Sequence, residues 1–298
     1  MKRNIQSEWG VLERVILGHG LSMGPRPTVE TAYDPTSRHH LREGTYPAPH
    51  DVAAELDGLA AAMERHGVEV LRPLNMPDLE QVFARDVGMV IGDRFFRANM
   101  IEERSAEWSG IQSLIEGPIV DIPGEVHMEG GDVLVLPDAL VVGVTRDPHR
   151  LALQTARTNA AAVDFLSAHF PDRDILSAEL HKDDHDPIRS ALHLDCAYMP
   201  LGGGQAIVCR DAFLHDHERE AIEQRHSAIA EISPEEAALL QSNLLHLAPD
   251  TVLIDPRFQR LSGILEQWGY TLVPCAMEHV GRMGGLFRCS TMPLLRAH

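Results

Sequence analysis

One pattern of apolar residues recurs five times along this 298-residue chain and constrains its fold more than any other feature. Each copy is an apolar run rich in Val and Ile, usually followed by a short break and a second apolar run. The copies are WGVLERVILGHG (9–20), VGMVIGDRFFRA (87–98), DVLVLPDALVVGV (132–144), AYMPLGGGQAIVC (197–209) and NLLHLAPDTVLID (243–255). Four of the breaks, GD, PD, GGG and APD, consist of turn residues, so these copies are predicted to be hairpins of buried strands.

Helical patterns lie between the copies. The segment 51–67, DVAAELDGLAAAMERHG, places its apolar residues on one face and ends at a glycine. Further helices are predicted at 151–170, 211–226 and 256–269, and short apolar runs lie at 68–73 and 269–274. The repeating unit is therefore strand, strand, helix, strand. Five such units would close into one α/β ring over residues 1–298, and a generic α/β sheet with irregular spacing is the alternative.

Charge and composition narrow the class of function. Acidic residues outnumber basic ones by 44 to 26, and a formal charge of -18 would repel nucleic acid and anionic membranes and attract a cationic ligand. The start MKRNIQSEWG has no apolar stretch of a signal peptide, and the four cysteines form no CxxC pair. We therefore expect a reduced, cytoplasmic protein without a nucleic-acid or membrane partner. The proline-rich segment 20–50 is predicted to be an irregular loop and is a candidate lid.

Polar side chains stand just before, or at the start of, four of the repeated copies. These residues are Arg85 and Asp86 before the second copy, Glu129 before the third, His193 and Asp195 before the fourth, and Asn243 at the start of the fifth. Equivalent positions in a ring of repeats lie at one end of its axis, so these side chains are predicted to meet around one pocket. Cys289 lies on the C-terminal stretch that must close the ring, and it would join them.

This set of residues indicates a particular chemistry. A thiol with a histidine suggests nucleophilic catalysis with a proton shuttle. Carboxylates around the nucleophile favour a cationic electrophile, and a guanidinium group fits because it pairs with carboxylates through two parallel hydrogen bonds. Each residue alone has a simpler interpretation, such as a turn residue for Asp86, a core histidine for His193 or a buried filler for Cys289.

The same residues, in the same order, resemble the guanidino-group-modifying superfamily with the pentein fold. This superfamily includes arginine deiminases, dimethylarginine dimethylaminohydrolases and glycine-type amidinotransferases. The matching stretches are SEWGVLERVILG, FARDVGMVIGDRFFRANM, MEGGDVLVL, HLDCAYM and GGLFRCSTMPLLR. The resemblance implies a five-unit pseudosymmetric α/β propeller, which agrees with the five repeats.

The resemblance also implies roles for the polar residues. Cys289 looks like the nucleophile that attacks the guanidinium carbon, and His193 like the acid that protonates the departing amine and then acts as a base. Glu129 resembles the acidic residue beside that histidine, and Asp86 and Asp195 resemble the carboxylates that hold the guanidinium. The intermediate would be a thiouronium on the cysteine, formed without a metal or an organic cofactor.

One position of the predicted site differs from the family pattern. A second part, the residue that binds a substrate carboxylate, has three candidates. Arg288 stands directly before the nucleophile, where many family members have His. A substrate carboxylate would be bound by Arg104, Arg146 or Arg157. Asn243 is grouped with these arginines as a substrate-binding residue.

The resemblance leaves two reactions open. The front half of the chain looks closer to amidinotransferases, whereas EGGD and CSTMPLLR look closer to deiminases and dimethylargininases. Because EGGD contains a reaction-centre residue, we expect a hydrolase that acts on arginine or a modified arginine and releases a ureido product such as citrulline. Transfer of the amidino group to an amine is the alternative.

Two other classes of function fit parts of the sequence. One is a binding protein built on the same ring. The other is a metallohydrolase that uses HKDDHD (181–186) or the histidine pair at 39–40 as ligands. The oligomeric state stays open, with a homodimer among the options.

Overall fold

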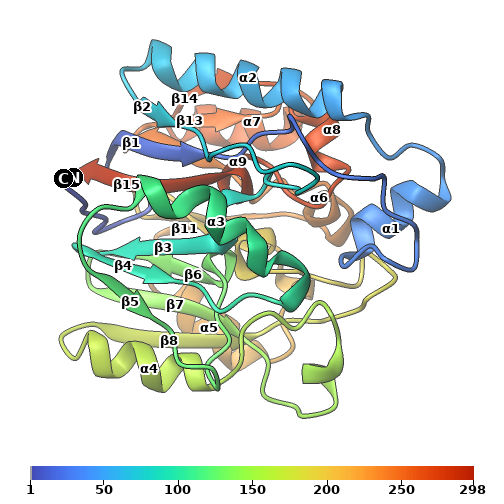
Figure 1. The fold of residues 1–298 in the computed structure, drawn as a ribbon. Coiled ribbons are helices and arrows are strands. Elements are labelled where there is room, and N and C mark those ends of the chain that lie inside the picture. The colour runs from blue at the N-terminus through green and yellow to red at the C-terminus, as the bar shows by residue number, and fades with distance from the viewer. Residues whose placement is uncertain (1) are drawn as a thin grey trace.

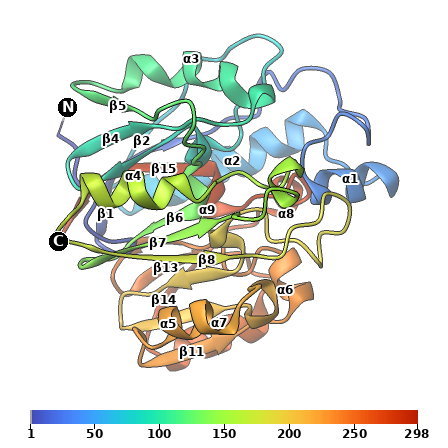
Figure 2. The same ribbon diagram turned by 90° about the horizontal axis from the view of Figure 1, so that it is seen from below.

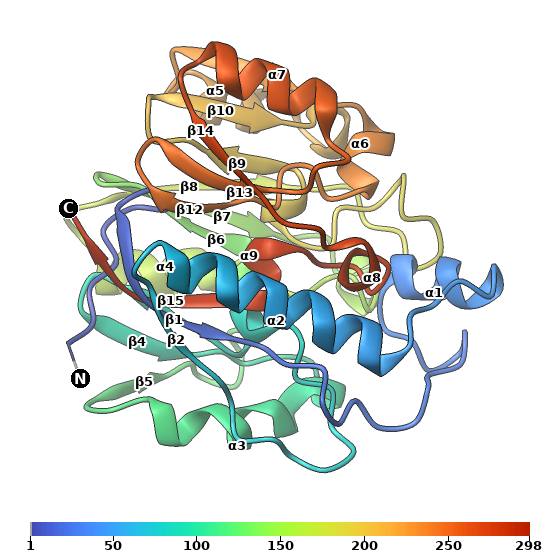
Figure 3. The ribbon, with the colours of Figure 1, turned by 90° about the horizontal axis from the view of Figure 1, so that it is seen from above.

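Five three-stranded sheets form the framework of the protein, whose computed structural model describes residues 2–298. Each sheet joins one antiparallel pair of strands to a third strand that runs parallel to its neighbour. The units follow one another around a ring (Figures 1 and 3). The predicted five-unit α/β propeller is therefore confirmed.

Four of the sheets begin with a hairpin at a predicted position. The hairpins are β3 (Gly88–Ile91) with β4 (Arg94–Arg97), β6 (Val133–Val135) with β7 (Ala139–Val144), β9 (Tyr198–Pro200) with β10 (Gln205–Val208), and β12 (Leu245–Ala248) with β13 (Thr251–Ile254). The third strands are β5 (Ile119–Asp121), β8 (Asp174–Glu179), β11 (Ala228–Glu231) and β14 (Thr271–Pro274). The turn residues and Val-rich runs thus define the hairpins locally, as the sequence predicts.

The remaining sheet closes the ring with strands from both ends of the chain. Here β15 (Thr291–Ala297) pairs antiparallel with β1 (Val11–Leu17), and β1 pairs parallel with β2 (Glu69–Leu71). The termini meet beside this sheet, where the Gln6 amide donates to His298 Nε2 at 3.0 Å. The C-terminal strand is therefore an integral part of the first unit, and it positions the segment that contains Cys289.

Helices lie around the outside of the ring. They include α2 (Pro49–Arg65), α4 (Ala161–His169), α5 (Asp216–Glu223) and α7 (Gln259–Gln267). Figure 1 shows α2 and α4 at opposite ends of the molecule, and Figure 2 shows α5 and α7 together on one side. Helix α2 begins at a proline and buries Val52, Leu56 and Leu59 against the core. Shorter helices are α1 (Pro35–Arg42), α3 (Trp108–Ile111), α6 (Pro234–Ala238), α8 (Glu278–Gly281) and α9 (Phe287–Ser290). Across residues 2–298, no helix has the length and apolar character needed to span a membrane.

Two sequence-based expectations are wrong in part. The helix predicted over 151–170 forms only as α4, because tertiary contacts hold the preceding residues in another conformation. The backbone amides of Gln154 and Thr155 donate to the Asp184 carboxylate at 3.1 and 3.0 Å. The segment 20–50 is not wholly irregular, since it contains α1, whose N-cap Asp34 accepts from the Ser37 amide at 2.7 Å.

Candidate active site

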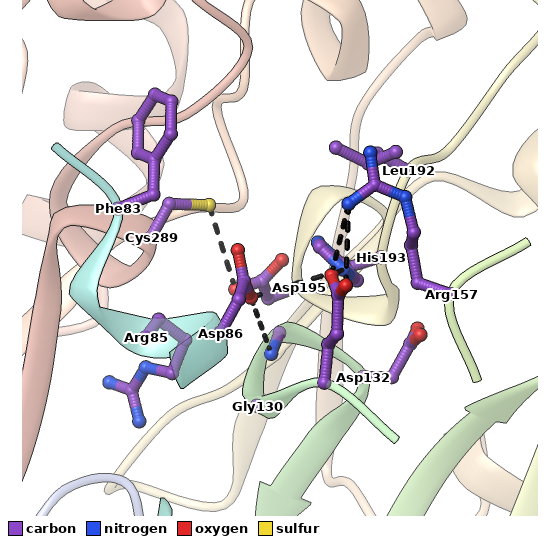
Figure 4. A network of polar contacts seen from close by, with 12 residues as sticks. Phe83, Arg85, Asp86, Gly130, Asp132, Arg157, Leu192, His193, Asp195 and Cys289 are labelled. Atoms are coloured by element: carbon purple, nitrogen blue, oxygen red, sulfur yellow. Dashed lines mark hydrogen bonds and ion pairs between the residues drawn. The ribbon is translucent and has the colours of Figure 1, made fainter. Parts of the chain in front are cut away.

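Short helical turns directly before the hairpins carry the polar residues singled out in the sequence. Asp86 lies on the turn Ala84–Val87, Asp195 lies on the turn Leu194–Cys196, and Glu129 and His193 immediately precede their turns. Cys289 lies on α9, at the corresponding place before β15. These equivalent positions bring the side chains together at one end of the ring, although the residues are far apart in sequence (Figure 4).

His193 is enclosed by carboxylates. Its Nε2 lies 2.8 Å from Glu129 Oε2 and 3.9 Å from Asp86 Oδ1, and all three side chains are buried. Burial alone would lower the pKa of His193, but these carboxylates outweigh it and raise the pKa to about 9. A Cβ at Gly131 would come within 2.6 Å of the imidazole, so the second glycine of EGGD leaves room for the ring. The imidazole is therefore protonated at neutral pH, the state in which a histidine can donate a proton.

Cys289 is held by an asparagine and faces a carboxylate. Asn243 Nδ2 donates to the Cys289 sulfur at 3.1 Å, while Asn243 Oδ1 accepts from the Cys289 amide at 3.0 Å. The sulfur lies 3.9 Å from Asp195 Oδ2. A hydrogen bond with Cys196, burial and the charge of Asp195 together raise the pKa of this thiol well above its ordinary value. The thiol is therefore protonated at rest, and a bound cation would favour its ionisation.

The carboxylates of the cluster each have a resident arginine. Arg104 donates to Asp86 at 2.7 Å, and Arg157 lies 3.1 Å from Glu129. Both of these arginines are buried. The cluster is therefore a charge-balanced network rather than a set of bare acids.

Arg288, which takes the place of the usual histidine, completes this network. Its Nη1 donates to Asp195 at 2.8 Å, and its other nitrogens donate to Glu8 at 3.0 and 3.2 Å. These two carboxylates and their hydrogen bonds raise the pKa of Arg288 despite its burial. Arg288 therefore orients Asp195 and does not contact the thiol through any hydrogen bond described for residues 2–298.

The comparison with protein families decides where this chain belongs. The model of the family described as "N,N dimethylarginine dimethylhydrolase, eukaryotic" matches residues 27–296. The chain belongs to this family. It is thus a member of the guanidino-group-modifying pentein superfamily, as its motifs predicted, and an enzyme that acts on guanidino groups.

Relatives and solved structures support the same fold. The uncharacterized protein YkgA of Bacillus subtilis (strain 168) is 27% identical over 295 residues, which are 98% of this chain and 94% of the relative. SxtG, an amidinotransferase from Microseira wollei, has a TM-score of 0.78 at 19% identity over 99% of this chain and 98% of its own. The inosamine-phosphate amidinotransferase StrB1 from Streptomyces griseus has a TM-score of 0.77 at 18% identity, over 99% of this chain and 97% of its own. The N-terminal domain of ArgZ, described as an arginine dihydrolase from cyanobacteria, has a TM-score of 0.77 at 17% identity, over 95% of this chain and 97% of its own.

Two acids of this family member were not foreseen from its sequence. Glu8 lies before β1 and pairs with Arg288, whereas Glu107 pairs with Arg104 at 2.7 Å from a position three residues later in the chain. The spacing of Arg104 and Glu107 was a usable signal, because residues three apart on a helical turn face each other. No local signal links Glu8 to the site, since its partner is 280 residues away.

The structure does not bring Arg146 to the cluster. Its guanidinium pairs with Glu218 at 2.7 Å and Glu179 at 3.3 Å, on the exposed side of β8 and α5. Arg104 and Arg157 do reach the cluster, but carboxylates of the protein already occupy their guanidinium groups. None of the three arginines that were candidates for binding a substrate carboxylate is therefore free to do so in this structure.

One group of residues has the composition of a metal site. The ligand atoms of Asp86, Glu129 and His193 lie within 4.8 Å of one another, and no other such group occurs among residues 2–298. The loop 181–186 and the histidine pair at 39–40 therefore do not assemble a ligand set. The resident arginines already neutralise the two carboxylates, so this cluster fits a metal ion poorly.

Proposed function

We propose that this enzyme is a cysteine-dependent hydrolase that removes an amine from the guanidino group of arginine or a modified arginine and releases a ureido product such as citrulline. The observation that carries the proposal is the placement of Cys289 and His193 on opposite sides of the Asp86 and Asp195 carboxylates (Figure 4). A planar guanidinium between these carboxylates would present its carbon to the sulfur and its leaving amine to the imidazolium.

The reaction follows from these positions in two halves. In the first, the Cys289 thiolate adds to the guanidinium carbon, His193 donates its proton to the leaving amine, and the C–N bond breaks to give a thiouronium on the sulfur. In the second, neutral His193 takes a proton from water as the oxygen adds to the same carbon. The C–S bond then breaks, which releases the ureido product and restores the thiol. Asn243 donates to the sulfur in both halves, where negative charge develops.

Transfer of the amidino group shares the first half of this reaction. It differs only in the second nucleophile, which is an amine instead of water. The similar structures include both amidinotransferases and an arginine dihydrolase, and at their identities they support the fold without separating the two reactions. The EGGD motif around Glu129 favours hydrolysis.

The test is incubation with a panel of guanidino compounds, with and without amine acceptors, scored for ureido products and transferred amidino groups. We expect ureido products without an acceptor, and a covalent adduct on Cys289 in acid-quenched mass spectrometry. Cys289→Ala should lower turnover by more than about a thousandfold. Activity should survive a chelator and be lost with iodoacetamide. An active Cys289→Ala enzyme, or an adduct on a different cysteine, would overturn the mechanism, and products formed only with an amine acceptor would identify a transferase.

A further inference from the structure

A small cavity lies between the strands β3, β6 and β15, which belong to three different sheets of the ring. Arg85 lines this cavity, and Figure 4 shows its guanidinium turned away from Asp86 and His193. The volume of the cavity is about 10 Å³, which is room for one particle of about the size of a water molecule. The cavity is therefore separate from the catalytic cluster and too small for a substrate.

Two buried arginines in the wall of this cavity have N–H groups without an acceptor. Arg85 is 5% exposed and Arg296 is 1% exposed. Nη2 of Arg85, and both Nε and Nη2 of Arg296, find no acceptor among residues 2–298. The hydrogen bonds that these two groups do make end on backbone carbonyls, those of Arg288, Gly10 and His246. Because a buried donor without an acceptor is destabilising, these three nitrogens require a ligand.

The acidic side chains nearby are already paired with a different arginine. Glu8 also lines the cavity, but its two oxygens accept from Arg288 at 3.0 and 3.2 Å. Asp195 accepts from Arg288 as well, at 2.8 Å. Three buried arginines, Arg85, Arg288 and Arg296, therefore share two carboxylates, which leaves one positive charge in excess.

Both arginines of the cavity are charged at neutral pH. Burial, together with the charge of Arg288, lowers the pKa of Arg85 to about 9 and that of Arg296 to about 10. Burial and Arg296 also lower the pKa of the neighbouring His246 to about 3, so this imidazole is neutral and adds no charge. The cavity is thus lined by two guanidinium cations that no carboxylate of their own neutralises.

We propose that this cavity binds one chloride ion, held by Arg85 from the second unit of the ring and by Arg296 from the first. The charge favours a monovalent anion, because a water molecule would satisfy the donors and leave the excess cation. The volume favours a monatomic anion, since a carboxylate or a phosphate is too large for it. The ion would join two units of the ring and stabilise their contact. This site is independent of the chemistry proposed at Cys289.

Thermal unfolding of the full chain tests the site in solution. Chloride replaces gluconate, an anion too large for the cavity, at constant ionic strength. A ligand that binds only the folded state stabilises it, so Tm should rise by about 2–4 °C for each tenfold increase in chloride above its dissociation constant. Bromide should have a similar effect. A Tm that is the same in chloride and gluconate would overturn the proposal and assign the cavity to water.

A substitution tests which residues hold the ion. Arg296→Met removes the excess positive charge and one side of the site, so the Tm of this variant should no longer depend on chloride. Arg260→Met is the matched control, because Arg260 pairs with Glu236 at the surface and should keep the chloride dependence of the wild-type protein. An equal chloride dependence in Arg296→Met and the wild-type protein would place the ion elsewhere and overturn the site.

Crystals of the wild-type protein grown in sodium bromide locate the ion directly, whether or not Arg296→Met folds. We expect an anomalous peak within hydrogen-bond distance of Arg296 Nε and Arg85 Nη2. The absence of a peak at this position would overturn the proposal. A peak there, combined with a Tm that does not respond to chloride, would mean binding at crystal concentration only and would also overturn it.

Discussion

The charge on His193 is set by the carboxylates around it. Its pKa of about 9 means that the imidazole stays protonated at neutral pH, which is the state needed to donate a proton to a departing amine. Glu129 contributes directly, because its carboxylate accepts a hydrogen bond from the ring at 2.8 Å. The protonation state of His193 therefore depends on a neighbouring carboxylate.

The pH profile tests this dependence. In the proposed mechanism protonated His193 is the active form, so kcat/KM should fall as pH rises through about 9. In Glu129→Gln, a neutral amide replaces the anion that raises the pKa of His193, so the alkaline limb should move to lower pH. Glu235→Gln, on the exposed helix α6, is the control and should leave the limb in place. An unchanged limb in Glu129→Gln would show that another group controls the alkaline side.

Helix α9 is tied to distant elements through one side chain. Arg288 donates to Asp195, to Glu8 ahead of β1 and to the backbone carbonyl of Val133 on β6, and all three partners are buried. The pKa of Glu8 is lowered to about 2, because Arg288 and Arg85 outweigh the cost of burying its charge. Glu8 therefore contributes stability above its ordinary pKa, and this contribution is lost as pH falls through about 2.

Removing Arg288 should destabilise the whole protein. Arg288→Leu leaves two buried carboxylates without their counter-ion, so the free energy of unfolding should fall by about 3–5 kcal/mol. Urea denaturation followed by circular dichroism measures this change. Arg260→Leu is the matched control, because Arg260 pairs with Glu236 at the surface and should contribute at most about 1 kcal/mol. Equal effects of the two substitutions would mean that the buried contacts of Arg288 with Glu8 and Asp195 do not stabilise the fold more than a surface ion pair does.

Closure of the ring is a property of the whole molecule, since β15 and β1 come from opposite ends of the chain. Deletion of residues 291–298 removes a strand that is almost wholly buried, so the truncated chain should lose cooperative unfolding. A circular permutant that joins the neighbouring termini and opens at the exposed turn around Gly124 keeps every sheet intact. It should therefore unfold cooperatively, as measured by near-ultraviolet circular dichroism. A truncated chain as stable as the parent would show that β15 is dispensable.

The sequence predicts the ring well because its signals are local. The turn residues between paired apolar runs are sufficient for β3–β4 and β6–β7, and equivalent positions in the repeats predict that Asp86, Glu129 and His193 meet. Long-range contacts limit the rest. The helical pattern that begins at 151 is overridden where Thr155 contacts Asp184, and the pairing of Arg288 with Glu8 joins residues at opposite ends of the chain.

The resident arginines have a consequence for what happens when a substrate arrives. Because the pairs Arg104–Asp86, Arg157–Glu129 and Arg288–Asp195 already exist, an incoming guanidinium adds positive charge to a balanced network. That added charge favours loss of the Cys289 proton, so substrate binding should release a proton to the solvent before any bond breaks. Stopped-flow mixing with a pH indicator should therefore detect a burst of acid within the first turnover in the wild-type enzyme. Cys289→Ser should show no burst, and a burst of equal size in that variant would assign the proton to another group.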